Sequence, residues 1–207
     1  MVEFMTTRQI DPKRLGLEIR ELRSARGLTL KEICAQISCS VAYLSRIELG
    51  AARISDALLA EISNVLAVDP TWFFPSQKSD NPVERAHIVR SNERRSLSEM
   101  YTRSQDELGF EDHLLSSTLS GDCYLLMSKF PPRVGAPPKQ AEGYVFEGEQ
   151  HGIVTKGEIL LILDEERIIL KKGDSFSYPS TLPHRFFNNS DKEAEMIWAM
   201  SPVRISW

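Results

Sequence analysis

The spacing of apolar residues changes partway along the chain. Between residues 15 and 66, apolar side chains recur three or four positions apart, as they do on one face of a helix. The positions form four runs: Leu15, Ile19 and Leu22; Leu30, Ile33, Cys34 and Ile37; Leu44 and Ile47; and Leu58, Ile62, Val65 and Leu66. This region therefore predicts four short helices packed in one bundle.

Local signals mark where these helices begin and end. The starting signals are Asp11 before Pro12, the capping-box pair Thr29 and Glu32, Ser40, Ser55, and Asp69 before Pro70. Gly27 and Gly50 predict helix ends. We expect Trp72, Phe73 and Phe74 to close the small helical core.

After about residue 120 the pattern becomes that of strands. Short runs rich in Ile, Leu, Phe and Tyr, separated by Gly, Pro, Asn and Asp, cover residues 123–130, 158–163, 167–170, 175–178, 184–188 and 195–200. Such spacing is typical of an all-β sandwich or barrel. Residues 113–119 are a further candidate strand, whereas residues 83–100 show no dominant period.

A polar segment separates the two patterns. Residues 76–82, SQKSDNP, have no apolar side chain before their proline, which favours a linker. The predicted organisation is an α-helical domain at residues 10–75, a linker at 76–82 and a β domain at 83–207. The fold class is therefore two-domain α+β.

Composition and charge limit the function. Apolar residues make up 42% and charged residues 26% of the chain, as expected for a folded protein. With a formal net charge of −4, binding to nucleic acid must be argued from a motif. Cys34, Cys39 and Cys123 are an odd number without a CxxC pair, which favours a reducing compartment. No apolar run approaches the roughly 20 residues of a membrane span, so we expect a cytoplasmic protein without a membrane partner.

The second and third predicted helices, residues 29–37 and 40–48, are joined by about three residues. Such a short connection makes the helices cross steeply, as in a helix-turn-helix. The run GLTLKEICAQISCSVAYLSRIELG resembles the lambda-repressor/Cro-like, or XRE, helix-turn-helix family, and the resemblance covers residues 13–74. It implies a domain that binds a double-stranded DNA operator as a dimer, on half-sites about one helical turn apart.

We expect the outward positions of these helices to contact DNA. Candidate contacts to base edges or phosphates are Val41, Ala42, Tyr43, Ser45 and Arg46. Candidate phosphate contacts are the capping residues Thr29 and Ser40 and the cations Lys31 and Arg53. The alternative is a helical bundle for protein contacts, in which Arg46 pairs with Glu48 or Glu32.

The β region resembles the cupins. In GDSFSYPSTLPHRFFN, residues 173–188, the second cupin motif G-x5-P-x-G-x2-H-x3-N is matched by Gly173, Pro179, His184 and Asn188, with Thr181 in place of glycine. When the first motif is aligned on Gly157, Gln150 takes the position of its glutamate, and Phe146 and Tyr144 take those of its histidines. The resemblance implies a jelly-roll barrel in which only His184 keeps the identity of a metal ligand.

This departure argues against a metal or another cofactor. A cupin metal takes about three imidazoles and a carboxylate, and phenol, phenyl and amide groups are poor substitutes. His151, Glu147 and Glu149 lie nearby, but strand alternation directs them to the opposite face unless Gly148 forms a bulge. We therefore predict no metal site.

The barrel is predicted to bind a small organic effector of unspecified class. Its expected lining is Tyr144, Phe146, Gln150, Phe176, Tyr178, His184, Phe186 and Trp198. The alternative is that these aromatic side chains simply fill the barrel.

The order of the domains resembles that of bacterial XRE-cupin regulators. We predict a transcription regulator without enzymatic activity, which forms a homodimer through the β domain. Two alternatives stay open: a metal-dependent cupin enzyme that carries a DNA-binding head, and a constitutive repressor whose cupin domain only dimerises.

Overall fold

The computed structural model describes residues 10–73, 82–97, 109–119, 121–132 and 143–202. These residues cluster into two units. One contains the described residues up to Ile88 together with Thr118 and Leu119, and the other contains the described residues between 89 and 117 and from 121 onward. Apart from Pro82, the predicted linker at residues 76–82 lies outside the described residues.

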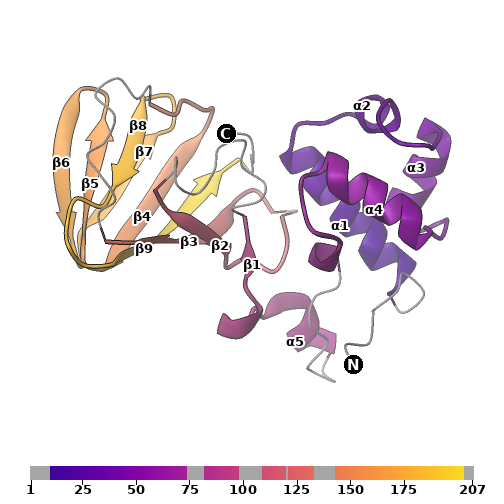
Figure 1. Cartoon of the computed structure of the whole chain (residues 1–207), viewed down its shortest axis with the longest axis horizontal. Helices are drawn as coiled ribbons and strands as arrows, with labels where there is room; N and C mark the ends of the chain where they lie inside the picture. Colours follow the sequence, from indigo (N-terminus) through magenta and orange to yellow (C-terminus); the bar gives the residue numbers. More distant parts are fainter. Residues whose placement is uncertain (1–9, 74–81, 98–108, 120, 133–142, 203–207) are drawn as a thin grey trace. The chain divides into compact units, whose positions relative to one another are not determined.

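The first unit is helical (Figure 1). Its elements are α1 (Pro12–Ala25), α2 (Leu30–Cys34), α3 (Val41–Glu48), α4 (Asp56–Val65), the 3-10 helix η2 (Pro70–Phe73) and α5 (Pro82–His87). The four helices predicted between residues 15 and 66 are all present. Trp72 and Phe73 are buried as expected, whereas Phe74 lies outside the described residues.

The predicted capping residues begin these helices. Thr29, Ser40 and Ser55 each accept a hydrogen bond from the backbone N–H three residues later. Gly27 and Gly50 follow the ends of α1 and α3 with φ of 67° and 68°, a region that favours glycine.

The second helix is shorter than predicted. We expected it to reach Ile37, but α2 ends at Cys34, and residues 35–40 form the connection to α3. The Gln36 N–H donates to the Ile33 carbonyl and the Cys39 N–H to the Ile37 carbonyl. These hydrogen bonds span three and two residues, whereas those of an α-helix span four. Ile37 is nevertheless buried, so a turn places it in the core as a helix would.

Helix α3 is fixed against α1. Leu44 and Ile47 are buried on its inner face, as predicted. Gly16 of α1 lies against the Ile47 carbonyl so closely that an added Cβ would come within 2.1 Å of the oxygen. This close approach sets the position of α3, which leaves its other face to solvent.

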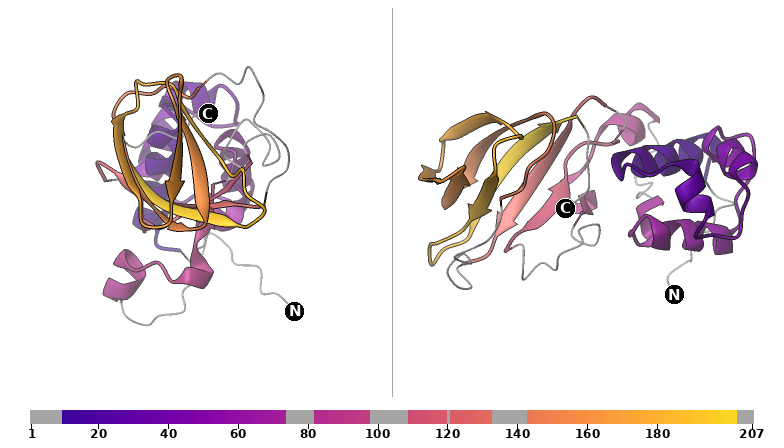
Figure 2. Two further views of the ribbon diagram at one scale, coloured as in Figure 1. Left: turned by 90° about the vertical axis from the view of Figure 1, so that its left-hand side faces the viewer. Right: turned by 90° about the horizontal axis from the view of Figure 1, so that it is seen from above.

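The second unit is built of strands. After the 3-10 helix η3 (Ser91–Glu93) come β1 (Arg95–Ser96), β2 (Glu111–Leu114), β3 (Tyr124–Phe130), β4 (Glu149–Lys156), β5 (Glu158–Leu163), β6 (Glu166–Lys171), β7 (Ser175–Pro179), β8 (His184–Phe187) and β9 (Ala194–Ser201). A six-stranded sheet has the order β1-β2-β3-β9-β4-β7, and a three-stranded sheet has the order β6-β5-β8. The left view of Figure 2 shows the two sheets facing each other around a common interior.

All six strands predicted after residue 120 are present, with small shifts at their ends. Sequence periodicity missed β4, β1 and the short helices of residues 82–93. The candidate strand at residues 113–119 was misplaced, because the strand observed there, β2, ends at Leu114.

The strand register decides which side chains enter the barrel. Gln150 of β4 pairs with Tyr178 of β7 and Met200 of β9, and all three are buried on the inner face. Glu147, Glu149 and His151 are exposed, as the alternation predicts. Among the described residues, none of the helices combines the length and hydrophobicity needed to cross a bilayer.

Candidate functional site

The first turn of α3 presents its side chains to solvent. Ser40 caps the helix by accepting the Tyr43 N–H at 3.2 Å. Val41, Ala42 and Tyr43 are exposed, whereas Ser45 one turn later is half-buried. The predicted contact positions at the start of α3 thus lie together on one accessible surface.

Two side chains of α3 also contact the loop that follows it. The Tyr43 hydroxyl donates to the Arg53 carbonyl at 2.8 Å, and Nη2 of Arg46 approaches the Ala51 carbonyl at 3.4 Å. The ring of Tyr43 therefore has a defined position, although its hydroxyl already has an acceptor. Arg46 and Arg53 remain exposed.

The Thr29 end of α2 is less open. Glu32 Oε2 accepts both the Thr29 N–H and the Thr29 hydroxyl at 2.7 Å. These hydrogen bonds, the backbone one first, lower the pKa of Glu32. The carboxylate occupies the donors that a phosphate would use, so the exposed Lys31 is the more accessible group on this helix.

The alternative ion pairs of Arg46 are not present. Glu48 is bound by Arg23 of α1, with Nε–Oε1 at 2.7 Å and Nη2–Oε2 at 3.0 Å. Glu32 serves the capping box instead. Within the part of the chain that the structure describes, Arg46 has no carboxylate partner. Sequence periodicity gave no sign of the Arg23–Glu48 pair, because its members lie 25 residues apart.

In the β unit, the four residues aligned with cupin metal ligands converge. The ring centroid of His184 lies 5.6 Å from that of Phe146 and 6.4 Å from that of Tyr144. Gln150 Nε2 lies 3.0 Å from His184 Nε2. Tyr144 also forms an isolated β-bridge with His184, which brings the loop before β4 to β8.

A chain of hydrogen bonds runs through this cluster. The Tyr178 hydroxyl donates to Gln150 Oε1 at 2.8 Å, and His184 Nδ1 lies 2.8 Å from the Leu182 carbonyl. An amide nitrogen and a carbonyl oxygen have fixed roles, so Nδ1 donates and Nε2 accepts from Gln150. His184 is therefore a neutral imidazole. Burial lowers its pKa, against a smaller opposing effect of the bond to Leu182.

These residues do not fit a metal ion. The cluster offers one imidazole, and the nitrogen that faces the cluster already accepts a hydrogen bond. Phe146 has no donor atom, and a neutral amide and a phenol are weak ligands for transition metals. Within the described parts of the chain, no group of three or more His, Cys, Asp or Glu side chains is placed to hold a metal.

The other predicted lining residues divide into two groups. Phe176 stacks on Tyr178 at 5.7 Å and contacts Phe186 at 5.1 Å, so it joins the His184 cluster across the two sheets. Trp198 instead donates its indole N–H to Ser128 Oγ at 2.7 Å.

The partner of Trp198 belongs to a polar network that sequence reasoning missed. Ser128 donates in turn to the buried carboxylate of Asp112 through a short hydrogen bond. Because these residues lie on three different strands, no local pattern connects them.

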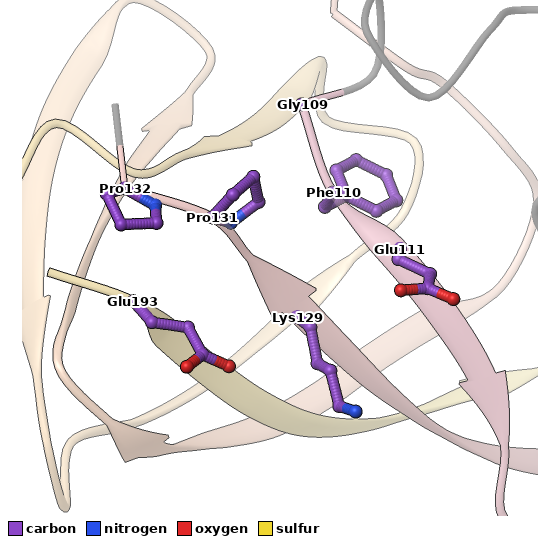
Figure 3. A pocket seen from close by; sticks show the side chains of 7 residues that line it. All are labelled: Gly109, Phe110, Glu111, Lys129, Pro131, Pro132 and Glu193. Carbon is purple, nitrogen blue, oxygen red and sulfur yellow. The ribbon is translucent and has the colours of Figure 1, made fainter. Parts of the chain in front are cut away.

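A separate hollow of about 440 Å³ opens beside β2 and β3. It is lined by Gly109, Phe110, Glu111, Lys129, Pro131, Pro132 and Glu193. Figure 3 shows the apolar rings of Phe110 and the prolines on one side and the three charged side chains on the other. None of the predicted lining residues belongs to it.

Comparison with known proteins bears on both units. A helix-turn-helix domain family matches residues 14–71, and a cupin domain family matches residues 137–200. The chain combines a helix-turn-helix domain with a cupin domain. This combination fits a DNA-binding transcription regulator, as predicted. No match was found among curated proteins.

Solved structures also resemble this helix-turn-helix–cupin protein. Hydroxypropylphosphonic acid epoxidase from S. wedmorenis is 15% identical, with 92% of this chain and 98% of that chain covered and a TM-score of 0.46. The same enzyme in complex with fosfomycin is 16% identical, with 93% of this chain and 100% of that chain covered and a TM-score of 0.44. An HTH_3 family transcriptional regulator from Vibrio cholerae is 18% identical, with 92% of this chain and 96% of that chain covered and a TM-score of 0.38. These likenesses are too distant to carry an activity to this chain.

Proposed function

We propose that this helix-turn-helix–cupin protein regulates transcription by binding an operator as a homodimer, with a small metabolite in its barrel as effector. The observation that carries the DNA part is the exposed first turn of α3. Val41, Ala42 and Tyr43 offer small or aromatic groups to bases there, and Arg46 has no competing carboxylate in the described structure. Lys31 and Arg53 add exposed cations for phosphates.

The DNA part is tested with a duplex selected by the protein from a random-sequence pool. Arg46→Ala is expected to weaken binding about five- to hundred-fold if Arg46 reads a base. Arg20→Ala, which removes an exposed arginine of α1, is the matched control. Equal effects of the two substitutions, or none from Arg46→Ala, would contradict this assignment.

Salt dependence separates phosphate contacts from base contacts. Lys31→Ala and Arg53→Ala should each remove one phosphate contact and so reduce the magnitude of the slope of log affinity against log salt by about one. Neither substitution should change the selected sequence. Tyr43→Phe keeps the ring but removes the bond to Arg53, so it distinguishes stacking from positioning. Sequence preference that survives Tyr43→Ala would exclude this ring from base recognition.

We place the effector beside Tyr144, Phe146, Gln150 and His184. Aromatic walls next to an ordered chain of polar groups are suited to an organic molecule with one or two hydrogen-bonding atoms. Effectors of this kind typically change DNA affinity five- to 150-fold. A saturating effector that changes operator affinity less than twofold would contradict the sensor function.

The hollow beside β3 is the second candidate for the effector. Its lining combines Phe110 and two prolines with Lys129, Glu111 and Glu193, so it is suited to a zwitterionic organic molecule whose carboxylate would meet Lys129. In a thermal-shift screen of metabolites, Gln150→Ala should abolish the response to a barrel ligand, and Lys129→Ala the response to a ligand in the hollow. No shift with any metabolite would favour the constitutive repressor.

A second copy of this chain is the proposed partner of the outer face of the six-stranded sheet. Leu125 and Ile153 are 40% and 42% exposed there, on strands that flank the half-buried Ile197 and Ala199 of β9. Leu125→Lys should convert the dimer to a monomer in sedimentation experiments. Ile169→Lys on the three-stranded sheet is the control, since Ile169 is 61% exposed on a different face.

We further propose that the cupin domain is not a metal-dependent enzyme. Its donor set supports this, because the His184 nitrogen that faces the cluster is already hydrogen-bonded. Elemental analysis of the purified protein tests the proposal. Stoichiometric iron, manganese, nickel or zinc that disappears in His184→Ala would support the enzyme alternative.

A further inference from the structure

Two cysteines lie side by side at the turn of the helix-turn-helix. Cys34 is the last residue of α2, and Cys39 directly precedes Ser40, which caps α3. Their Sγ atoms are 3.8 Å apart, and both residues are free thiols with partial exposure. The DNA-binding function explains neither of them, since a turn needs no sulfur.

The backbone of the turn holds the two thiols in this position. The Cys39 N–H donates to the Ile37 carbonyl at 3.0 Å, and the neighbouring Ser38 N–H donates to Glu61 Oε2 of α4 at 2.8 Å. Ile37, which lies between the two cysteines in the sequence, is buried and anchors the turn in the core. The sulfurs are therefore near each other before any reaction occurs.

We propose that Cys34 and Cys39 are an oxidative modification site, at which a hydroperoxide closes a disulfide that weakens DNA binding by α3. The effect on DNA rests on the function proposed above, whereas disulfide formation does not. The site would make the regulator sensitive to peroxide independently of any ligand in the cupin barrel.

The reaction proceeds in two steps. One of the two thiols loses its proton, and its sulfur attacks one oxygen of hydrogen peroxide. The O–O bond breaks, a sulfenic acid forms, and the departing hydroxide takes up the released proton to give one water. The other thiol then loses its proton, its sulfur attacks the sulfenic sulfur, the S–O bond breaks, and the departing hydroxide takes up that proton as the second water. Overall, two thiols are oxidised to one disulfide and one peroxide is reduced to two waters.

The protein environment affects the reactivity of Cys39. Burial, followed by the hydrogen bond and charge of Cys34, raises the pKa of Cys39 to about 11. A raised pKa disfavours the Cys39 thiolate, which is the form that attacks a peroxide. The same disulfide results whichever of the two sulfurs reacts first with the peroxide.

Closure of the disulfide changes the turn. A disulfide has an S–S distance of about 2.05 Å, so the two sulfurs must approach each other by about 1.8 Å. Cys39 is bonded to the cap residue Ser40, and the proposed base contacts, Val41 to Tyr43, follow at once. The strain of closure therefore acts next to the cap of α3, and we expect displacement of the contacts there to lower DNA affinity about tenfold or more.

Disulfide formation is tested on the full-length Cys123→Ser variant, which removes the exposed third thiol. After treatment with hydrogen peroxide, mass spectrometry under non-reducing conditions should show a loss of two hydrogens within the peptide that spans residues 34–39. Dithiothreitol should reverse this loss, and Cys34→Ser and Cys39→Ser should lack it. Two intact or separately over-oxidised thiols would refute the proposal. If Cys34→Ser lowers helix content, Cys34→Ala replaces it.

The DNA effect is measured with the duplex selected by the reduced protein. Oxidation should weaken binding at least about tenfold in Cys123→Ser, and not in Cys39→Ser, with recovery on reduction. A disulfide that forms without changing affinity would overturn the switch. If the reduced protein selects no duplex, the proposed DNA-binding function fails, and the mass measurement still decides whether the disulfide forms.

Discussion

The ion pair between Arg23 and Glu48 is predicted to hold α3 in place. Arg23 of α1 binds both carboxylate oxygens of Glu48 in α3, and its Nη1 also donates to the Leu28 carbonyl at 2.8 Å. The side chains are only 15% and 5% exposed. Glu48→Gln keeps the shape of the side chain but leaves the guanidinium partly buried without a counter-charge.

The expected cost follows from this burial. Removing one partner of a buried pair costs about 3 to 5 kcal/mol, and the residual exposure of Arg23 favours the lower end, about 3 kcal/mol. Removing both charges in Arg23→Met with Glu48→Leu should restore stability to within about 1 kcal/mol of the parent. The pair is thus expected to specify the position of α3 more than it adds stability.

Urea unfolding of the full chain, followed by far-UV circular dichroism, measures these differences. Glu193→Gln is the control, because it breaks a 2.8 Å pair with Lys156 that lies in solvent, and the transition should not move. A loss below about 1 kcal/mol in Glu48→Gln, or a double variant no more stable than the single one, would refute the reasoning.

Three further predictions concern stability. The lowered pKa of His184 means that, as pH falls below about 6.5, this side chain takes up a proton more readily in the unfolded chain than in the folded one. The free energy of unfolding should therefore decrease below that pH, and it should decrease less in His184→Gln. Equal pH profiles of the two proteins in urea titrations would contradict this. Ala67 has a φ of 52°, so Ala67→Gly should raise stability by up to about 1 kcal/mol, whereas Ala57→Gly inside α4 should lower it by about 1 kcal/mol in the same thermal melts. Gly152→Ala would place a Cβ 2.4 Å from Phe176 Cζ and should cost about 1 to 3 kcal/mol; an unchanged melting temperature would show that the ring moves freely.

The helical unit was predictable where its signals are local. Caps such as Ser40 and Ser55 act on backbone groups three residues away, so sequence spacing reveals them. The end of α2 was not predictable, because Ile37 is buried by a turn at the spacing that a helix would also give. The Arg23–Glu48 pair joins distant residues and has no signal in the periodicity.

In the β unit, motif spacing succeeded where periodicity failed. Strand β4 escaped detection because its inward positions include Gln150 and Gly152 in place of apolar side chains, whereas the apolar Ile153 faces outward. The two cupin motifs nevertheless placed Gln150 and His184 at metal-ligand positions, and the structure brings these two side chains together. The direction of their hydrogen bonds depends on the carbonyl of Leu182, whose position only the fold supplies.

The identity of three side chains, rather than the backbone, separates this barrel from a metal-binding cupin. Tyr144, Phe146 and Gln150 surround His184 at the positions where the cupin motif has two histidines and a glutamate. Tyr144→His, Phe146→His and Gln150→Glu together should therefore create a site for one zinc or nickel ion per chain. Gln150→Glu alone should not, because it leaves a single imidazole.

Equilibrium dialysis with elemental analysis measures the uptake, and circular dichroism checks that the triple variant remains folded. Metal bound one to one by the triple variant and not by the parent would show that the backbone still brings the four positions to one point. A folded triple variant without metal would mean that they do not converge closely enough. Equal, tight binding by the parent would instead show that His184 releases its bond to Gln150 for an ion, and the metal-free barrel would have to be abandoned.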